Sequence, residues 1–263
     1  FGTEEIFGRA RLVDDNTDEE FIGLDLIREI PDDEVEFLKP KGNDHSFVPD
    51  ITPSLSNALR YFWLACAARR SRGHENVFST MLIHTTQLIN VHNSTRTQVV
   101  DFKSGILKEL RGRNSKNLIN SLKQQWEEEQ SKVASAAFGE EFIEFSLLEK
   151  NLLKVIEESN VVVDNFRSDY RLSYDGEPKI QIAIGGNTLS RGLTLEGLIV
   201  SFFVRSAGTY DTLLQMGRWF GYRPGYADLP RIWMTEELRD QFFDLATVEA
   251  EMRRDITDYE LKG

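Results

Sequence analysis

The sequence contains a single cysteine, Cys66, in 263 residues, which excludes an intrachain disulfide and any metal site built from several cysteines. Cys66 lies on an apolar helical face, where we expect it to fill the core. No apolar run approaches the roughly 20 residues that a membrane-spanning helix needs, and no signal peptide opens the chain. We therefore expect a cytoplasmic protein with no membrane partner.

Positive charge is also scarce, since the sequence has 31 Lys and Arg but 43 Asp and Glu, which gives a net charge of −12. Residues 1–50 hold 15 of the acidic and 5 of the basic residues, a net −10, which leaves −2 for the other 213. Apolar residues are interleaved with the acidic ones, so residues 1–50 are predicted to be an acidic docking segment, not a disordered tail. Residues 51–263 are nearly neutral, and we expect the chain to bind DNA weakly by charge alone.

The remaining chain alternates between strand and helix patterns. Short apolar runs predict five strands, which lie near residues 80, 161, 180, 198 and 231. Helical patterns dominate between the first two strands, and we interpret about 112–150 as a helical insertion. A last helix is predicted from Thr235 to about Asp255. The sequence therefore predicts an α/β fold in which helices flank a mostly parallel sheet.

Residues 180–223 combine a strand, a glycine-rich loop, a second strand and a helix. Three alternating isoleucines predict the first strand. Gly185-Gly186 follows, where a backbone without Cβ atoms can approach a ligand closely. Residues 198–204 are typical of a strand buried on both faces, and residues 210–219 predict an arginine-bearing helix. This order is typical of a site that handles phosphate.

Two short motifs in this stretch resemble those of superfamily-two helicases. Residues 187–193, Asn-Thr-Leu-Ser-Arg-Gly-Leu, resemble the fifth helicase motif, and residues 215–223 resemble the sixth. The longer string over 181–235 is similar to the bacterial Z1 domain family. That family has been described as an endonuclease family, associated with helicase motifs in restriction-like defence proteins. The resemblance runs from about residue 20 to the C-terminus and implies a RecA-like sheet.

The sequence lacks the G-x-x-x-x-G-K-[ST] loop that cradles nucleotide phosphates, and it lacks an acidic pair at a strand end suited to magnesium. The resemblance therefore implies only the second lobe of a two-lobed motor. ATP and Mg²⁺ would be bound mainly by an N-terminal lobe of the same protein, absent from this chain, and DNA is the expected nucleic acid. The isolated chain is expected to be inactive, within a parent protein that hydrolyses nucleoside triphosphates.

The resemblance also assigns site residues. In the sixth motif, Arg218 or Arg223 would be the arginine finger that stabilises charge on the transferring phosphoryl group, and Gln215 would fix the nucleotide or the finger. The two arginines are five positions apart instead of the usual three, so either could be the finger. The loop around the fifth motif would link nucleotide state to the nucleic-acid backbone. Its candidate residues are Gly185, Gly186, Asn187, Ser190, Arg191 and Gly192.

The polar end of the first predicted strand, His84-Thr85-Thr86, resembles the fourth helicase motif. Loops at the carboxyl ends of parallel strands carry ligand contacts, so Thr85 and Thr86 are candidates for contact with the nucleic-acid backbone. His84 and His92 raise the alternative of a metal site. No nearby residue completes a ligand set at a diagnostic spacing, and we predict no metal site.

Two other functions remain open. A nuclease centre of the PD-(D/E)xK type needs a carboxylate at one strand end and Glu-x-Lys on the next strand. The sequence offers Glu177-Pro178-Lys179 after Asp164 or Asp175, but Pro178 would interrupt strand pairing. The second alternative is a non-catalytic scaffold lobe that binds DNA or a partner protein through the helical insertion and the acidic segment.

Overall fold

The computed structural model describes residues 3–10, 22–113, 115–164, 172–185, 195–205 and 224–262. The strands are β1 (Ile27–Glu29), β2 (Ser79–His84), β3 (Asn160–Asp164), β4 (Ile180–Gly185), β5 (Leu198–Phe203) and β6 (Arg231–Met234). They form one sheet in the order β1-β6-β5-β2-β4-β3, and every neighbouring pair is parallel. The predicted α/β fold with a parallel sheet is confirmed.

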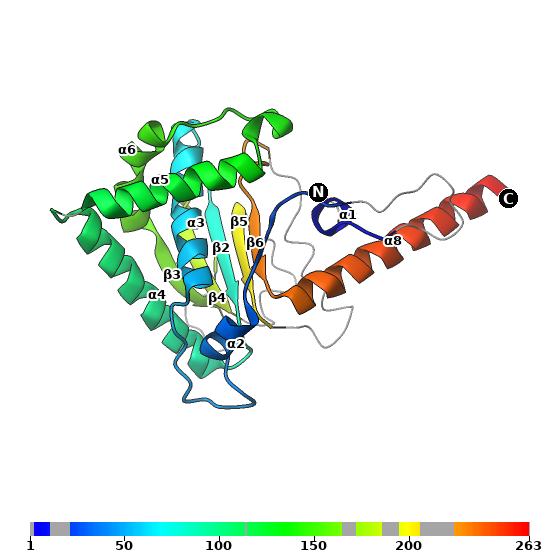
Figure 1. The fold of residues 1–263 in the computed structure, drawn as a ribbon, viewed down its shortest axis with the longest axis horizontal. Coiled ribbons are helices and arrows are strands. Elements are labelled where there is room, and N and C mark those ends of the chain that lie inside the picture. The colour runs from blue at the N-terminus through cyan, green and yellow to red at the C-terminus, as the bar shows by residue number, and fades with distance from the viewer. Residues whose placement is uncertain are drawn as a thin grey trace.

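Helices cover both faces of this sheet. They are α1 (Thr3–Phe7), α2 (Asp32–Leu38), α3 (Pro53–Ser71), α4 (Ile89–Leu110), α5 (Ser115–Lys132), α6 (Phe145–Glu158) and α8 (Glu236–Lys262), with a 3-10 turn, η1, at Ser135–Phe138. Figure 1 shows α3 to α6 on one side of the sheet and α1 and α8 on the other. Each side buries its own apolar cluster, and Trp63 lies in the first and Phe242 in the second.

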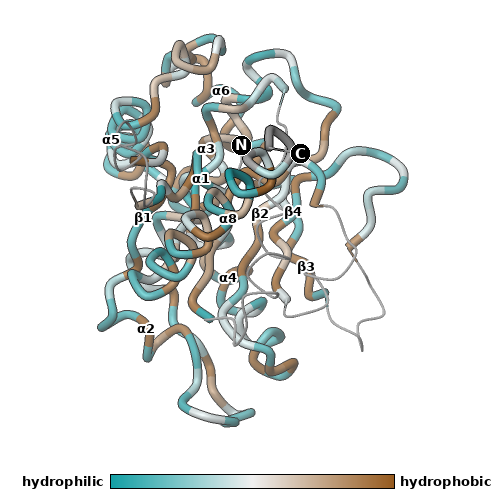
Figure 2. Tube along the Cα trace, turned by 90° about the vertical axis from the view of Figure 1, so that its right-hand side faces the viewer, coloured by the Kyte–Doolittle hydropathy of each residue, from teal (hydrophilic) through white to brown (hydrophobic). Residues whose placement is uncertain are grey.

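The central strands are buried on both faces, which the sequence predicted for residues 198–204. Every residue of β2, β4 and β5 is buried. Figure 2 shows brown segments along β2 and β4. In β4 the isoleucines join the cluster under α3 to α6, whereas Ala183 joins the cluster under α8. Two-sided burial explains the apolar run of β5, because a strand with one wet face would alternate polar residues.

Helix α3 is the central helix on the first face. The Thr52 hydroxyl accepts the Leu55 N–H at 3.3 Å, and Pro53 occupies the first turn, so the helix begins as these residue types favour. At its other end, Gly73 adopts a φ of +83° that favours glycine. The helix buries Trp63 and also Cys66, which confirms the predicted core role of the cysteine. Each such large apolar side chain contributes about 1.5–3 kcal/mol when removed from water.

Strand β1 and helix α2 lie inside the segment predicted to dock. Ile27, Arg28 and Glu29 of β1 pair with Ile232, Trp233 and Met234 of β6, so the acidic segment extends the sheet. The sequence pattern did not predict this strand, because three half-exposed residues are too short to display a period. Helix α8 continues to Lys262, past its predicted end near Asp255.

Candidate functional site

Because all six strands are parallel, their carboxyl ends lie along one edge of the sheet. At the centre of that edge, β2 ends at His84 between β4, which ends at Gly185, and β5, which ends at Phe203. The loop that resembles the fifth helicase motif follows β4 directly, and the segment that resembles the sixth follows β5. Both segments therefore start from the two neighbours of β2, whose end resembles the fourth motif.

His84 fixes the point where the glycine-rich loop begins. Its ring Nδ1 lies 2.8 Å from the carbonyl oxygen of Gly185, which can only accept, so Nδ1 carries the proton and donates. The imidazole also meets the Phe203 ring edge-on, at 6.1 Å between centroids. Burial lowers the pKa of His84 to about 4; the Gly185 carbonyl opposes this shift, and Arg205 and His92 add to it. His84 is therefore a neutral hydrogen-bond donor that ties β2 to β4.

The turn after β2 is held by a second histidine. His92, in the first turn of α4, donates from Nε2 to the Thr86 carbonyl at 2.8 Å. The Thr86 hydroxyl accepts the Leu88 N–H at 3.2 Å. Thr85 and Thr86 are both buried, with 4% and 7% exposure, so these two candidates lie at the predicted edge but below the surface. The geometry gives Thr86 a turn-stabilising role, and its contact with nucleic acid stays a prediction.

The exposed part of this edge carries polar groups that the sequence reasoning missed. A cleft of about 430 Å³ is lined by His45, Gln87, Leu88, Ile89 and Asn90. Arg205, just after β5, donates to the Gln87 side-chain oxygen at 3.0 Å, and burial lowers the pKa of its guanidinium. The rule that ligand contacts follow strand ends could have found Arg205 and Gln87. His45 comes from the acidic segment, whose position the sequence could not supply.

Most of the remaining candidates lie outside the described residues. This applies to Gly186, Asn187, Ser190, Arg191 and Gly192 of the fifth motif and to Gln215, Arg218 and Arg223 of the sixth. Gly185, the one loop candidate that is described, lies at the carboxyl end of β4 as predicted. The structure thus describes the strand ends from which these segments depart.

The residues of the alternative nuclease centre are not brought together. Asp164 pairs with Gly185 at the carboxyl end of β4, whereas Glu177 and Lys179 precede its amino end at Ile180. Strand β4 has six residues and spans about 17 Å between these ends. Asp175 lies in the same amino-end turn, where its carboxylate accepts from the Ser173 hydroxyl. A metal needs ligands about 2.0–2.6 Å away on several sides, so Asp164 and Glu177 do not form one metal site.

Neither a metal cluster nor a membrane span is found in the described part of the chain. No group of three His, Cys, Asp or Glu side chains there could hold a metal ion. None of the described helices has both the length and the apolar character needed to cross a bilayer.

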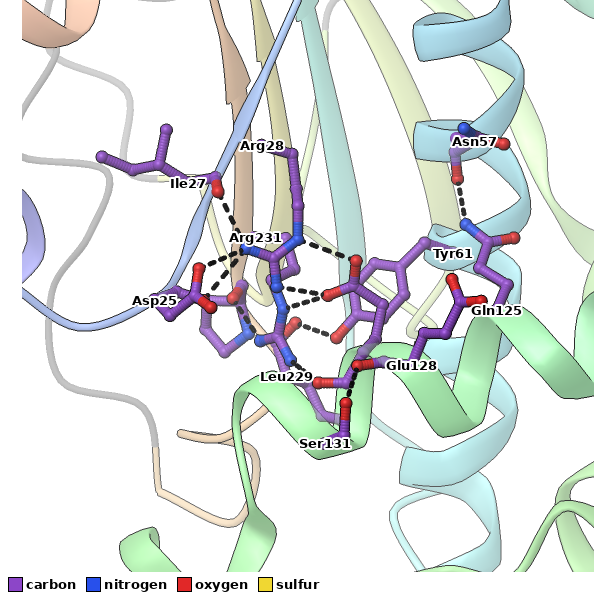
Figure 3. A network of polar contacts seen from close by, with 12 residues as sticks. Asp25, Ile27, Arg28, Asn57, Tyr61, Gln125, Glu128, Ser131, Leu229 and Arg231 are labelled. Atoms are coloured by element: carbon purple, nitrogen blue, oxygen red, sulfur yellow. Dashed lines mark hydrogen bonds and ion pairs between the residues drawn. The ribbon is translucent and has the colours of Figure 1, made fainter.

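A larger cleft, of about 540 Å³, lies between β1, α3 and α5, and its floor is an ion-pair network. The Glu129 carboxylate accepts from Arg28 at 2.7 and 2.6 Å and from Arg231 at 2.7 Å. Figure 3 shows the side chains of Arg28 and Arg231 within this network. Burial raises the pKa of Glu129, but the two arginines outweigh it and the net shift is downward. Arg231 also donates to the carbonyls of Asp228 and Pro230. These paired charges join β1, α5 and β6, which is a structural role.

A comparison with family profiles identifies the family of the chain. A profile of the Z1 domain matches residues 54–263, from the first turn of α3 to the end of the chain. The chain belongs to the Z1 domain family. No curated protein and no solved structure matches it. The Z1 match begins after β1 and α2, so the strand that completes the sheet beside β6 comes from outside the matched region.

Proposed function

We propose that this Z1 domain is the second motor lobe of a helicase-like, DNA-dependent ATPase from a bacterial protein of the restriction or defence type. One observation carries the proposal. The strands preceding the fourth, fifth and sixth motif-like segments, β2, β4 and β5, are adjacent and parallel, with their carboxyl ends together. A ligand at that edge could be contacted from all three segments at once.

In this proposal the chain stabilises charge on the transferring phosphoryl group, and it links nucleotide state to the nucleic-acid backbone. Arg218 or Arg223 is the arginine finger, and Gln215 positions it or the nucleotide. ATP with Mg²⁺, held by the N-terminal lobe of the same protein, provides the phosphoryl group. Among the described residues no group of three His, Cys, Asp or Glu side chains could hold a metal ion, and the magnesium ligands would lie mainly in the N-terminal lobe. Its arginines would stabilise the charge that develops on the phosphoryl oxygens.

Two described contacts support a pre-organised carboxyl edge of the sheet, as a ligand site there would need. The His84 N–H donates to the Gly185 carbonyl and the His92 N–H donates to the Thr86 carbonyl, so two buried rings fix the backbone of neighbouring loops. Loops that carry ligand contacts need such support, because small displacements of a catalytic group cost large factors in rate. Neutral rings suit this role, since burial lowers the pKa of both histidines.

The experiment measures ATPase activity and DNA cleavage side by side in the complete protein. The variants are Arg218→Ala, Arg223→Ala and Glu177→Ala. We expect one arginine variant to lose ATP turnover and Glu177→Ala to retain both activities that the wild type shows. Loss of cleavage with intact ATP turnover in Glu177→Ala would support the nuclease instead. Normal turnover in both arginine variants would support the scaffold.

A further inference from the structure

Helix α8 is held against the body only over its first part. Leu238, Phe242 and Leu245 are buried in the second apolar cluster. Phe7 of α1 stacks on Phe242 with 4.5 Å between ring centroids. Ala10 then donates its backbone N–H to the Thr247 hydroxyl at 3.0 Å. Beyond this point Figure 1 shows the helix projecting away from the sheet.

The projecting part keeps an apolar face that is open to water. Val248, Met252, Ile256 and Tyr259 are 48%, 60%, 58% and 85% exposed. Met252, Ile256 and Tyr259 follow at spacings of four and three, which repeats the spacing of Leu238, Phe242 and Leu245. This is the seam pattern of a coiled coil. A projecting helix of this length is marginal in water on its own, so the seam points to a helical partner.

The charge of Glu249 on the seam determines which helix can pair with α8 and in which direction. Glu249 lies on the seam, seven residues after Phe242 and seven residues before Ile256. No ion pair or hydrogen bond of its carboxylate is seen among the described residues. In an antiparallel pair of identical helices, Met252 can lie opposite the partner's Ile256. The same register places Glu249 opposite the partner's Tyr259. The phenol can then donate to the carboxylate. A parallel pair would instead align two Glu249 carboxylates, which repel.

We infer that two copies of this chain associate through the projecting part of α8, antiparallel, with Met252 layered against the partner's Ile256. The seam from Glu249 to Tyr259 is about 15 Å long, from the rise of 1.5 Å per residue. That is short compared with standard interfaces, which bury about 800 Å² per partner. The dimer is therefore weak and reversible, with a dissociation constant in the range of about 10–500 µM.

Sedimentation velocity over a concentration series of the chain tests the association. Wild type should shift from monomer toward dimer with rising concentration, and the pair Met252→Asp with Ile256→Asp should stay monomeric. Thr257→Asp is the matched control, because Thr257 is exposed beside the seam and its hydroxyl bonds only its own helix, to Arg253. It should dimerise like wild type. A wild type that stays monomeric up to about 1 mM, or a double variant that still dimerises, would overturn the inference.

Disulfide trapping tests the direction. Chains with Met252→Cys and chains with Ile256→Cys are mixed, oxidised and weighed by mass spectrometry. The antiparallel layer predicts crosslinks mainly between the two different variants, since only those positions face each other within disulfide reach. Cys66 should not interfere, because it is buried and burial raises the pKa of its thiol to about 12. Crosslinks mainly between identical variants would overturn the antiparallel register.

Discussion

Replacing Glu129 should be among the most destabilising changes on this chain. Its carboxylate neutralises Arg231, which is fully buried, and Arg28, whose side chain is 11% exposed. In Glu129→Ala, the acceptors left to Arg231 among the described residues would be carbonyls, from Asp228, Pro230 and residue 129 itself. Removing one partner of a buried ion pair costs about 3–5 kcal/mol. In a chain of this size that lowers the melting temperature by about 10 °C.

The assay is urea and thermal unfolding followed by circular dichroism, with Glu128→Ala as the matched control. Glu128 lines the same cleft but is exposed, and within the described part of the chain its carboxylate accepts only from Gln124 on its own helix. We expect that control to change the free energy of unfolding by less than about 0.5 kcal/mol. A cost below about 1 kcal/mol for Glu129→Ala would refute the argument that this network joins β1, α5 and β6.

The same network predicts a pH dependence. The pKa of Glu129 is lower in the folded chain than its ordinary value, because Arg28 and Arg231 outweigh the effect of burial. Its stabilising effect is therefore present above the unfolded pKa of about 4.3 and is lost as the pH falls through the folded value. The difference between wild type and Glu129→Ala should shrink in strong acid. A difference that stays constant down to pH 2 would contradict this reasoning.

Three further predictions concern Gly197, His84 and DNA binding. Gly197→Ala should cost more than about 3 kcal/mol, because an added Cβ would lie 1.9 Å from the Phe78 carbonyl oxygen. Gly42→Ala, also at positive φ but in open space, should cost only about 1–2 kcal/mol, and equal costs in urea unfolding would refute the clash. Burial lowers the pKa of His84 to about 4, so unfolding takes up a proton. The free energy of unfolding should fall by up to about 1.4 kcal/mol per pH unit from about 6.5 to 4, and His84→Asn should flatten that decline. In fluorescence anisotropy the isolated chain should bind DNA poorly at physiological salt, since its net charge is −12; tight binding with a steep salt dependence would reveal a basic surface.

The sequence predicted the sheet well because the signal was local. All five predicted strands exist, and β5 is buried on both faces, as the apolar run of residues 198–204 indicated. β3 was also found, although it lies at the sheet edge and its valines are only half-buried. Strand order could not be predicted, since periodicity carries no information on which strands are neighbours.

The candidate site was predictable only in part. Motif resemblance led to Gly185, Thr85 and Thr86, and the structure places all three at the carboxyl edge. The burial of the threonines depends on the turn that His92 and Leu88 close, which is a tertiary arrangement. The ion-pair network could not be predicted either, because Arg28, Glu129 and Arg231 are far apart in the sequence and meet only after β1 joins β6.

Turnover by arginine variants of the complete protein tests the central claim most directly. The assay measures single-turnover ATP hydrolysis at saturating DNA for alanine and lysine variants of Arg218 and Arg223, with folding checked by circular dichroism. We predict that alanine at one position lowers the rate by about 10³–10⁵ without unfolding the protein. Lysine there should rescue poorly, because a point charge does not reproduce the planar guanidinium fork. Wild-type rates in both alanine variants would contradict the assignment of this Z1 domain as a motor lobe.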